Sequence, residues 1–153
     1  MSSFFPLFMD ISRIKVLFIG GGRIAERRIQ TLRQFDALII VIAPRVTPVL
    51  QQLAEYGQII WIQRAYQTGD FADPTIGIAV LCTDDRKVNH AASIEAQQEG
   101  IPISVADCKE ESTFYFPGIA KNGNMVVGVS SSGTDHREAA RITTKIRTLL
   151  EES

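Results

Sequence analysis

The stretch VLFIGGGRIAERR, residues 16–28, decides which fold the rest of the chain can build. The run from Lys15 to Ile19 is too apolar to have a solvent-facing side, which predicts a strand of a parallel sheet covered on both faces. Three glycines follow, and then a helical pattern from Arg23 to about Gln34. A strand, a glycine turn and a helix in this order are typical of a site for a dinucleotide pyrophosphate.

Short apolar runs and longer helical patterns continue to alternate along the chain. Further strands are predicted at residues 38–42, 59–63, 78–83 and 103–106. Thr47 followed by Pro48 predicts the start of a helix that ends near Tyr56, and Asp84 and Asp85 are candidate caps for a helix that ends at Glu99. Five strands with helical crossovers predict an α/β fold with a Rossmann-like, doubly wound parallel sheet.

The pattern changes after residue 112. Two strand-like runs surround Asn122-Gly123, a favoured hairpin turn, and a final helix is predicted at residues 135–151. Because a lone hairpin and one helix bury little surface, we expect this segment to pack against a second copy in a homodimer. The predicted domains are a nucleotide-binding domain at residues 1–112 and a small β-hairpin plus helix dimerisation segment at residues 113–153.

Composition excludes several classes of protein. The net charge of −1 over 153 residues provides no basic face for nucleic acid. Cys82 and Cys108 form no CxxC pair and no Cys/His cluster, so we expect no metal site and a reducing compartment. No apolar stretch reaches the roughly 20 residues of a membrane span, which favours a soluble, cytoplasmic protein with no membrane partner.

The glycine turn fits the dinucleotide-binding pattern G-x-G-x-x-[G/A]. Gly20 permits the tight turn, Gly22 lets the backbone approach phosphates, and the small Ala25 lets the helix lie close to the first strand. The acidic residue expected about 20 positions later, which would bind the adenine ribose, is absent. Arg45 stands in this region and could contact the ribose or a 2′-phosphate, so this rule leaves NAD and NADP open.

Five separated motifs then occur in order: FPLFMDI, VLFIGGGRIAERR, AVLCTDDRKVN, SVADCKEESTFYFP and MVVGVSSSG. Together they resemble the siroheme synthase family, which includes precorrin-2 dehydrogenases and sirohydrochlorin ferrochelatases. The resemblance implies oxidation of the tetrapyrrole precorrin-2 to sirohydrochlorin with NAD as the hydride acceptor. In bifunctional members it also implies insertion of Fe²⁺ to give siroheme.

The resemblance implies that Asp107, in SVADCK, is the acid–base residue. The residues themselves agree, because a carboxylate just beyond a buried parallel strand lies where open α/β sheets bind ligands. It would accept a proton as hydride leaves the substrate, or pyrrole protons during metal insertion. The alternative is that Asp107 only caps a turn.

The resemblance also implies cofactor contacts at the ends of three strands. Thr83 is a candidate for the nicotinamide ribose region, whereas Asp84 and Asp85 could instead serve only as helix caps. The cofactor-binding candidates are Gly20, Gly22, Arg23, Ile24, Pro44, Arg45, Thr83 and Asp84.

The predicted substrate carries many carboxylates, so its site should offer cations, and the resemblance adds Ser131. The alternative is that each such side chain belongs only to a solvated surface. In place of the usual Ser-Pro continuation after the serine-glycine stretch, this chain has residues 132–136, SGTDH. The weaker substrate-binding candidates are Lys109, Lys121, Ser131 and Arg137.

Three functions therefore stay open. The first is an NAD-dependent precorrin-2 dehydrogenase, and the second is a bifunctional dehydrogenase and ferrochelatase. The third is a paralogue that binds NAD or tetrapyrrole without catalysis. Members of the family usually continue into a further helical domain, which is absent from this sequence of 153 residues, so we expect the cofactor site to be complete and the substrate site to be less so.

Overall fold

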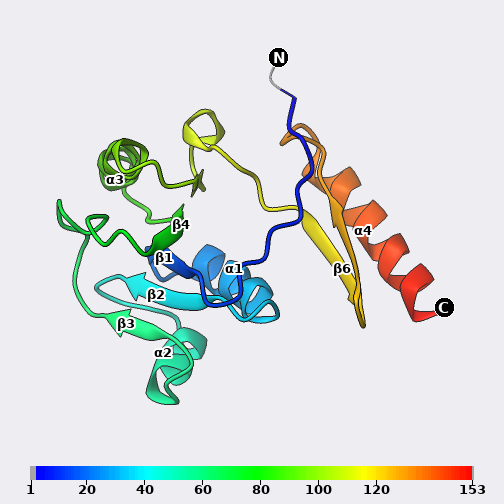
Figure 1. Ribbon diagram of the computed structural model, residues 1–153, viewed down its shortest axis with the longest axis horizontal. Helices are drawn as coiled ribbons and strands as arrows, with labels where there is room; N and C mark the ends of the chain where they lie inside the picture. The colour runs from blue at the N-terminus through cyan, green and yellow to red at the C-terminus, as the bar shows by residue number, and fades with distance from the viewer. Residues whose placement is uncertain (1–2, 153) are drawn as a thin grey trace. The chain divides into compact units, whose positions relative to one another are not determined.

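The computed structural model describes residues 3–152 (Figure 1). The chain divides into two compact units. One unit consists of residues 9–113, and the other combines residues 3–8 with residues 114–152. No helix within the described residues is long and apolar enough to cross a membrane.

The first unit contains a five-stranded parallel sheet with the order β3-β2-β1-β4-β5. This order confirms the predicted Rossmann-like fold, in which the chain reverses direction across the sheet between β1 and β4. Ligands in such sheets bind at the carboxyl ends of the strands near this reversal. The strands are β1 (Lys15–Ile19), β2 (Leu38–Ile42), β3 (Ile60–Ile62), β4 (Ile76–Leu81) and β5 (Ile103–Val105).

Three helices connect these strands, and their starts follow the predicted caps. The Thr47 hydroxyl accepts a hydrogen bond from the Leu50 backbone N–H, and the Asp85 carboxylate accepts from the Lys87 and Val88 N–H groups. Asp84 does not cap the helix. The helices are α1 (Arg23–Arg33), α2 (Pro48–Glu55) and α3 (Arg86–Gln98).

β4 corrects the sequence prediction, because it occupies residues 76–81 rather than 78–83. Ile76 pairs with Lys15 at a register irregularity, which extends the strand backwards. Cys82 and Thr83 leave the sheet and lie against Gly20. A short 3₁₀ helix, η1 (Lys109–Glu111), was also not predicted.

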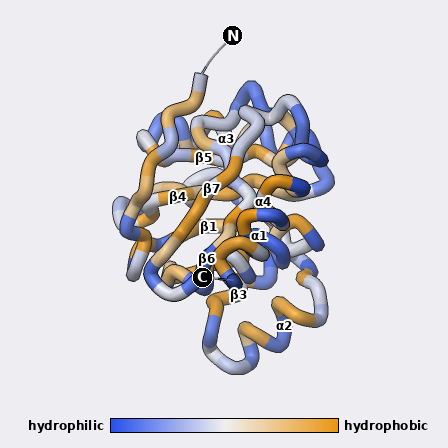
Figure 2. The backbone as a smooth tube through the Cα atoms, turned by 90° about the vertical axis from the view of Figure 1, so that its right-hand side faces the viewer, coloured by the Kyte–Doolittle hydropathy of each residue, from blue (hydrophilic) through white to orange (hydrophobic). Residues whose placement is uncertain are grey.

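The core of the first unit lies on both faces of the sheet. Val16, Phe18 and Val41 are fully buried on one face, as their continuous apolar runs predict. Leu17, Ile19 and Leu81 are 2% exposed or less on the other face. In Figure 2, α1, α2 and α4 alternate between hydrophobic and hydrophilic colours. The sheet, buried on both faces, therefore carries the loops at its carboxyl edge.

The second unit is an antiparallel hairpin covered by one helix: β6 (Gly118–Asn122), β7 (Met125–Val129) and α4 (His136–Glu151). The hairpin is confirmed, but its turn is Gly123-Asn124 rather than Asn122-Gly123. Asn122 pairs with Met125, and Gly123 takes a φ of 58° at the first turn position, where a type II′ turn requires glycine. The Asn122 side chain instead donates to the Leu150 carbonyl oxygen, which ties the hairpin end to α4.

α4 packs on the hairpin through Thr143, which is 2% exposed, whereas Leu149 on the same helix is 62% exposed. A Cβ on Gly118 would lie 2.2 Å from the Thr143 Oγ1, so the helix approaches the strand only because residue 118 has no side chain. Phe4 packs on Tyr115, with ring centroids 4.2 Å apart, which attaches the N-terminal segment to this unit.

Substituting Gly118→Ala should destabilise the second unit, because the new methyl group overlaps Thr143. We expect a loss of about 1–3 kcal/mol in the free energy of unfolding, the usual cost of overpacking. Urea denaturation followed by circular dichroism measures it. The matched control is Gly128→Ala, whose Cβ would lie no closer than 3.5 Å to Pro117. Equal stability of the two variants would contradict this packing.

Candidate functional site

A cleft of about 540 Å³ lies at the carboxyl edge of the sheet in the first unit. Its walls are the turn after β1, the loop after β2 and the turn after β4, with Ala65 and Tyr66 from the loop after β3. The predicted cofactor residues that line it are Gly20, Gly22, Pro44, Arg45, Thr83 and Asp84. Arg23 and Ile24 begin α1 beside this cleft and are exposed, and their contact with cofactor stays a prediction.

The three glycines of the turn have different roles. Gly20 has a φ of 112°, and a Cβ there would lie 2.8 Å from the Cys82 backbone carbon and oxygen. A Cβ on Gly22 would meet nothing within 4 Å, so its side of the turn is open. Gly21, which the sequence pattern leaves undefined, would place a Cβ 2.4 Å from Val46. The lack of a side chain at Gly20 and Gly21 therefore lets the turn after β1 pack closely against the loops after β4 and β2. Gly22 leaves room for a ligand.

The N-terminus of α1 suits a phosphate group. Gly22 is its N-cap and has no side chain that could accept from the first-turn amides. Ala25 is fully buried, which brings the helix close to β1. Uncapped amides and the positive end of the helix dipole favour an anion at this position. The turn therefore fits the pyrophosphate of a dinucleotide.

The turn after β4 is held by a buried asparagine. Asn89 is fully buried, its Oδ1 accepts from the Thr83 hydroxyl at 2.7 Å and from the Thr83 N–H at 3.1 Å, and its Nδ2 donates to the Thr83 carbonyl at 3.1 Å. The single hydroxyl proton of Thr83 is thus already donated, so toward a ligand this hydroxyl can act as an acceptor. Asp84 is exposed at the cleft, next to the capping Asp85.

The end of β2 carries no carboxylate into the cleft. Among the described lining residues the acidic ones are Asp84 and Asp85, both after β4, whereas Arg45 follows β2. The Trp61 Nε1 donates to the Ala43 carbonyl at 2.9 Å, which orders the backbone before Pro44. The loop after β2 therefore offers Arg45 rather than an acid, and the choice between NAD and NADP stays open, as the sequence left it.

Tyr66 is a lining residue that sequence reasoning missed. Its hydroxyl donates to Glu95 of α3, and the other oxygen of Glu95 accepts from the Gly69 and Phe71 N–H groups at 2.8 and 3.1 Å. Burial, then the contact with Glu95, raises the pKa of Tyr66, which keeps its hydroxyl protonated. Tyr66 and Glu95 are 29 positions apart, and no local pattern links them.

Asp107 is the second residue after β5, at the same edge of the sheet. The Ala106 N–H donates to the Leu81 carbonyl at 2.9 Å, so the chain stays beside β4 up to this point. The Asp107 carboxylate accepts from Arg86 at 2.7 Å and, among the described residues, from no backbone amide. The partner of Asp107 is therefore a cation. If Asp107 only capped a turn, its partner would be a backbone amide. Asp107 is not among the residues that line the cleft.

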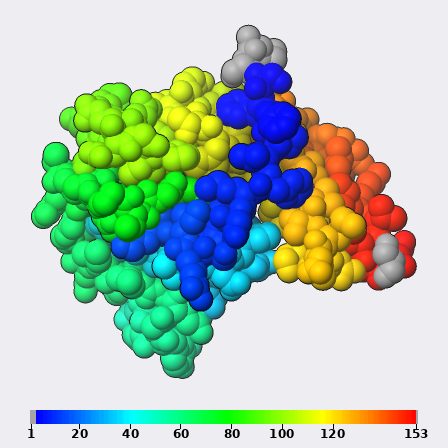
Figure 3. Space-filling view, in the orientation of Figure 1, coloured from blue at the N-terminus to red at the C-terminus, as the bar shows by residue number. Residues whose placement is uncertain are grey.

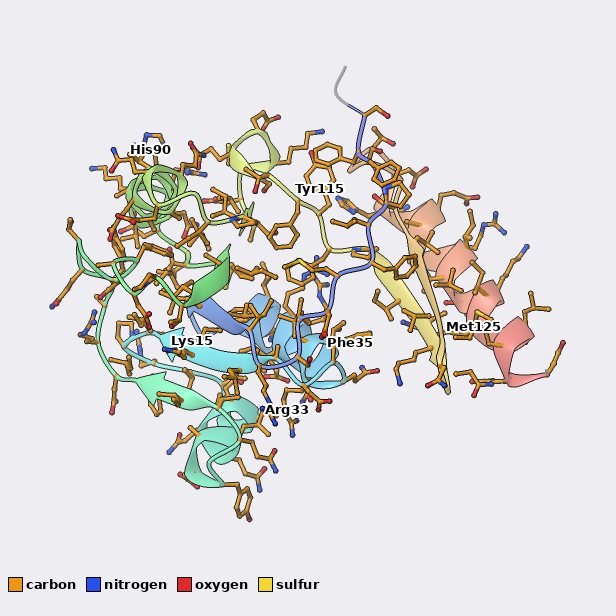
Figure 4. All side chains as sticks on the ribbon, in the orientation of Figure 1. Lys15, Arg33, Phe35, His90, Tyr115 and Met125 are labelled. Carbon is orange, nitrogen blue, oxygen red and sulfur yellow. The ribbon has the colours of Figure 1, made fainter. Side chains whose placement is uncertain are left out.

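Arg86 and Glu111 are further residues at this edge that sequence reasoning missed. Arg86 also donates to Glu111 at 2.5 Å, and the Nδ1 of His90 lies 2.8 Å from the other Glu111 oxygen. Figure 4 labels His90 on α3. Burial alone would raise the pKa of Glu111, but hydrogen bonds from His90 and Arg86 lower it, so the carboxylate is ionised at neutral pH. His90 is exposed and bonded to Glu111.

The predicted substrate residues fall in both units. Lys109 is exposed in η1 of the first unit, whereas Lys121 in β6 and Arg137 in α4 are exposed in the second. The Ser131 Oγ accepts from the Asp135 N–H at 2.9 Å and so orders the loop before α4. Their contact with substrate stays a prediction. Within the described residues there is no group of three or more His, Cys, Asp or Glu side chains placed to hold a metal ion.

Comparison with known proteins defines the class. A family described as "Putative NAD(P)-binding" matches residues 7–118, and the chain belongs to this family. A solved structure, "SirC, precorrin-2 dehydrogenase", has the same fold, with a TM-score of 0.76 and 23% sequence identity, over 95% of this chain and 71% of that one.

More specific relatives confirm the resemblance to siroheme synthases. The "Probable multifunctional siroheme biosynthesis protein HemA" of Ruminiclostridium josui is 40% identical over 144 residues, 94% of this chain and 28% of that protein. The siroheme synthase of Methylobacillus flagellatus is 34% identical over 145 residues, 95% of this chain and 31% of that protein. The chain therefore spans about a third of the length of these relatives.

The different environments of Gly20 and Gly22 predict different effects of alanine. Gly22→Ala should leave the free energy of unfolding within about 1 kcal/mol, the range of an N-cap change, and weaken NAD binding roughly tenfold, or by about 1.4 kcal/mol. Gly20→Ala should instead cost about 1–3 kcal/mol of stability, because a strained backbone and a backbone clash coincide. Urea denaturation and isothermal titration with NAD measure the two. Unchanged NAD affinity in Gly22→Ala would contradict the phosphate site.

Proposed function

We propose that the chain oxidises precorrin-2 to sirohydrochlorin and transfers the hydride to NAD. One observation carries the proposal: a cleft with an open glycine backbone and an uncapped helix N-terminus lies at the same sheet edge as the Asp107 carboxylate. The similarity to siroheme synthases supports the choice of substrate. The family supports the choice of cofactor.

Different residues of the cleft would bind different parts of the cofactor. The backbone at Gly20 and Gly22 and the first-turn amides of α1, at Arg23 and Ile24, would hold the pyrophosphate. The adenosine would lie against Pro44 and Arg45. The nicotinamide ribose would lie near Thr83 and Asp84, where the Thr83 hydroxyl, which donates its proton to Asn89, would accept a hydrogen bond from the ribose. Bound NAD would supply the acceptor for the hydride.

Asp107 would manage the proton of the reaction. The oxidation removes two electrons and two hydrogens from the macrocycle, one hydrogen as hydride and one as a proton. The carboxylate of Asp107 would take the proton and later release it to water. The cationic side chains of Lys109, Lys121 and Arg137, together with Ser131, would bind the carboxylates of the substrate.

We further propose Fe²⁺ as a second substrate, since the relatives are named for siroheme, which contains iron. In that step the pyrrole nitrogens of sirohydrochlorin become the ligands, and Asp107 takes up the protons that they lose. We place both reactions in the cytoplasm, where the free thiols of Cys82 and Cys108 stay reduced.

Substituting Asp107→Ala should lower turnover by about 10²–10⁴-fold, the usual contribution of a general base. NAD affinity should change by less than about twofold, because Asp107 does not line the cleft. The assay follows NADH, and in parallel NADPH, formed from fresh precorrin-2 without air, and a second arm adds Fe²⁺ to sirohydrochlorin against a protein-free control.

Glu110→Gln is the matched control, since Glu110 is an exposed carboxylate in the same loop. If Asp107→Ala turned over as fast as Glu110→Gln, the proposed role of Asp107 would be contradicted. Tight binding of NAD or precorrin-2 by the unsubstituted protein, without reduced cofactor, would instead favour a non-catalytic binding protein.

We propose that the second unit joins two copies in a homodimer. Large apolar side chains are exposed on it: Phe5 (84%), Leu7 (75%), Phe8 (75%), Leu149 (62%) and Met125 (59%). Figure 3 shows the N-terminal segment, in dark blue, at the surface, and Figure 4 labels Met125 on the hairpin. Burial of such surface stabilises an association by about 25 cal/mol per Å².

Light scattering should give about twice the chain mass of 16.9 kDa. Leu149→Glu should weaken the dimer at least tenfold, because a buried charge replaces an apolar contact. Thr148→Glu adds the same charge one position away, on an exposed residue, and should leave the dimer intact. A monomeric unsubstituted chain would contradict the proposal.

A further inference from the structure

Arg86, the first residue of α3, has no role in the cofactor site described above and is in contact with the proposed base. We propose that Arg86 is a positioning residue that orients the Asp107 carboxylate toward the substrate. The inference rests on the proposed oxidation, in which Asp107 accepts a proton. It adds a residue that acts through Asp107 and touches neither the cofactor nor the reacting atoms.

The geometry of the contact leaves one oxygen of Asp107 for the reaction. The Nη1 of Arg86 donates to the Oδ1 of Asp107 at 2.7 Å. Among the described residues, the Oδ2 of Asp107 accepts no hydrogen bond, so this oxygen is available to a proton. The side chains of Arg86 and Asp107 are 42% and 35% exposed, which leaves the carboxylate accessible to a ligand.

Arg86 is held by a rigid turn. The Asp85 carboxylate caps α3, and the buried Asn89 binds Thr83 at the end of β4. β4 pairs with β5, the strand that precedes Asp107, through Leu81 and Val105. The backbone of Arg86 is therefore fixed relative to the backbone of Asp107, which a positioning role requires.

A second hydrogen bond, from Nη2, fixes the orientation of the Arg86 guanidinium. Arg86 Nη2 donates to Glu111 at 2.5 Å, and His90, one helical turn along α3, bonds the other oxygen of Glu111. The planar guanidinium thus spans two carboxylates, one on each nitrogen. A lysine, which is a compact single charge on a flexible stem, cannot hold both in this geometry. An exposed ion pair contributes little to stability, so the cost of losing Arg86 should appear in catalysis.

The test uses the full chain and four variants: Arg86→Gln, Arg86→Lys, Glu111→Gln and the control Lys87→Gln. Lys87 is exposed on the same turn of α3, so the control loses the same charge one residue away. With precorrin-2 and NAD, Arg86→Gln should lower kcat about 10- to 100-fold, because the Asp107 carboxylate loses the hydrogen bond that holds it in position for proton transfer. KM for both substrates and the thermal midpoint should match the control. Arg86→Lys should restore part of kcat, and Glu111→Gln, which keeps the bond to Asp107, should lose less than Arg86→Gln.

Four other outcomes would overturn the inference, and they differ from one another. A raised KM for precorrin-2 with unchanged kcat would make Arg86 a substrate-binding residue. A lowered thermal midpoint together with lost NAD affinity in both Arg86 variants would make it structural. Activity equal to that of Lys87→Gln would remove the role altogether. If the unsubstituted protein forms no reduced cofactor, the proposed oxidation fails, and the role of Arg86 fails with it.

Discussion

The close approach of the glycine turn after β1 to the backbone at the end of β4 is the constraint on which the first unit depends. Gly20 passes so close to Cys82 that a Cβ would overlap its carbonyl group. The contact joins the two strands that flank the reversal of the sheet, where such folds bind ligands. Gly22 and Thr83, which follow Gly20 and Cys82 in the chain, both line the cleft.

The same edge of the sheet carries a continuous polar network. Asn89 holds the turn after β4, this turn caps α3, and the first residue of α3 reaches the carboxylate that follows β5. At each step, a side chain is held in place by a backbone segment that other contacts already fix. Preorganised groups of this kind reduce the rearrangement needed during a reaction, so under the proposed role we expect the Arg86 contact to affect turnover more than stability.

The second unit depends on a different close approach. Thr143 packs where Gly118 leaves space, so one helix can cover a hairpin that would be marginal alone. The exposed Leu149 and Met125 are then left outside this small core. The unit is therefore built around small residues inside and large apolar residues outside, an arrangement that suits association with another chain.

The sequence by itself determined the strand order class, the Thr47 cap and the glycine turn, because these follow from local patterns: apolar runs, a Thr-Pro pair and spaced glycines. For α3 it left Asp84 and Asp85 both open as caps. It also pointed to Asp107, since a carboxylate after a parallel strand lies at the ligand edge. Only the tertiary structure decided which residues surround that carboxylate. Arg86 and Glu95 act on partners 21 and 29 positions away, and such pairings arise from strand neighbours and helix packing, which no local pattern encodes. The shifts at β4 and at the hairpin turn have the same origin, because pairing with another strand, rather than local preference, sets where a strand begins and ends.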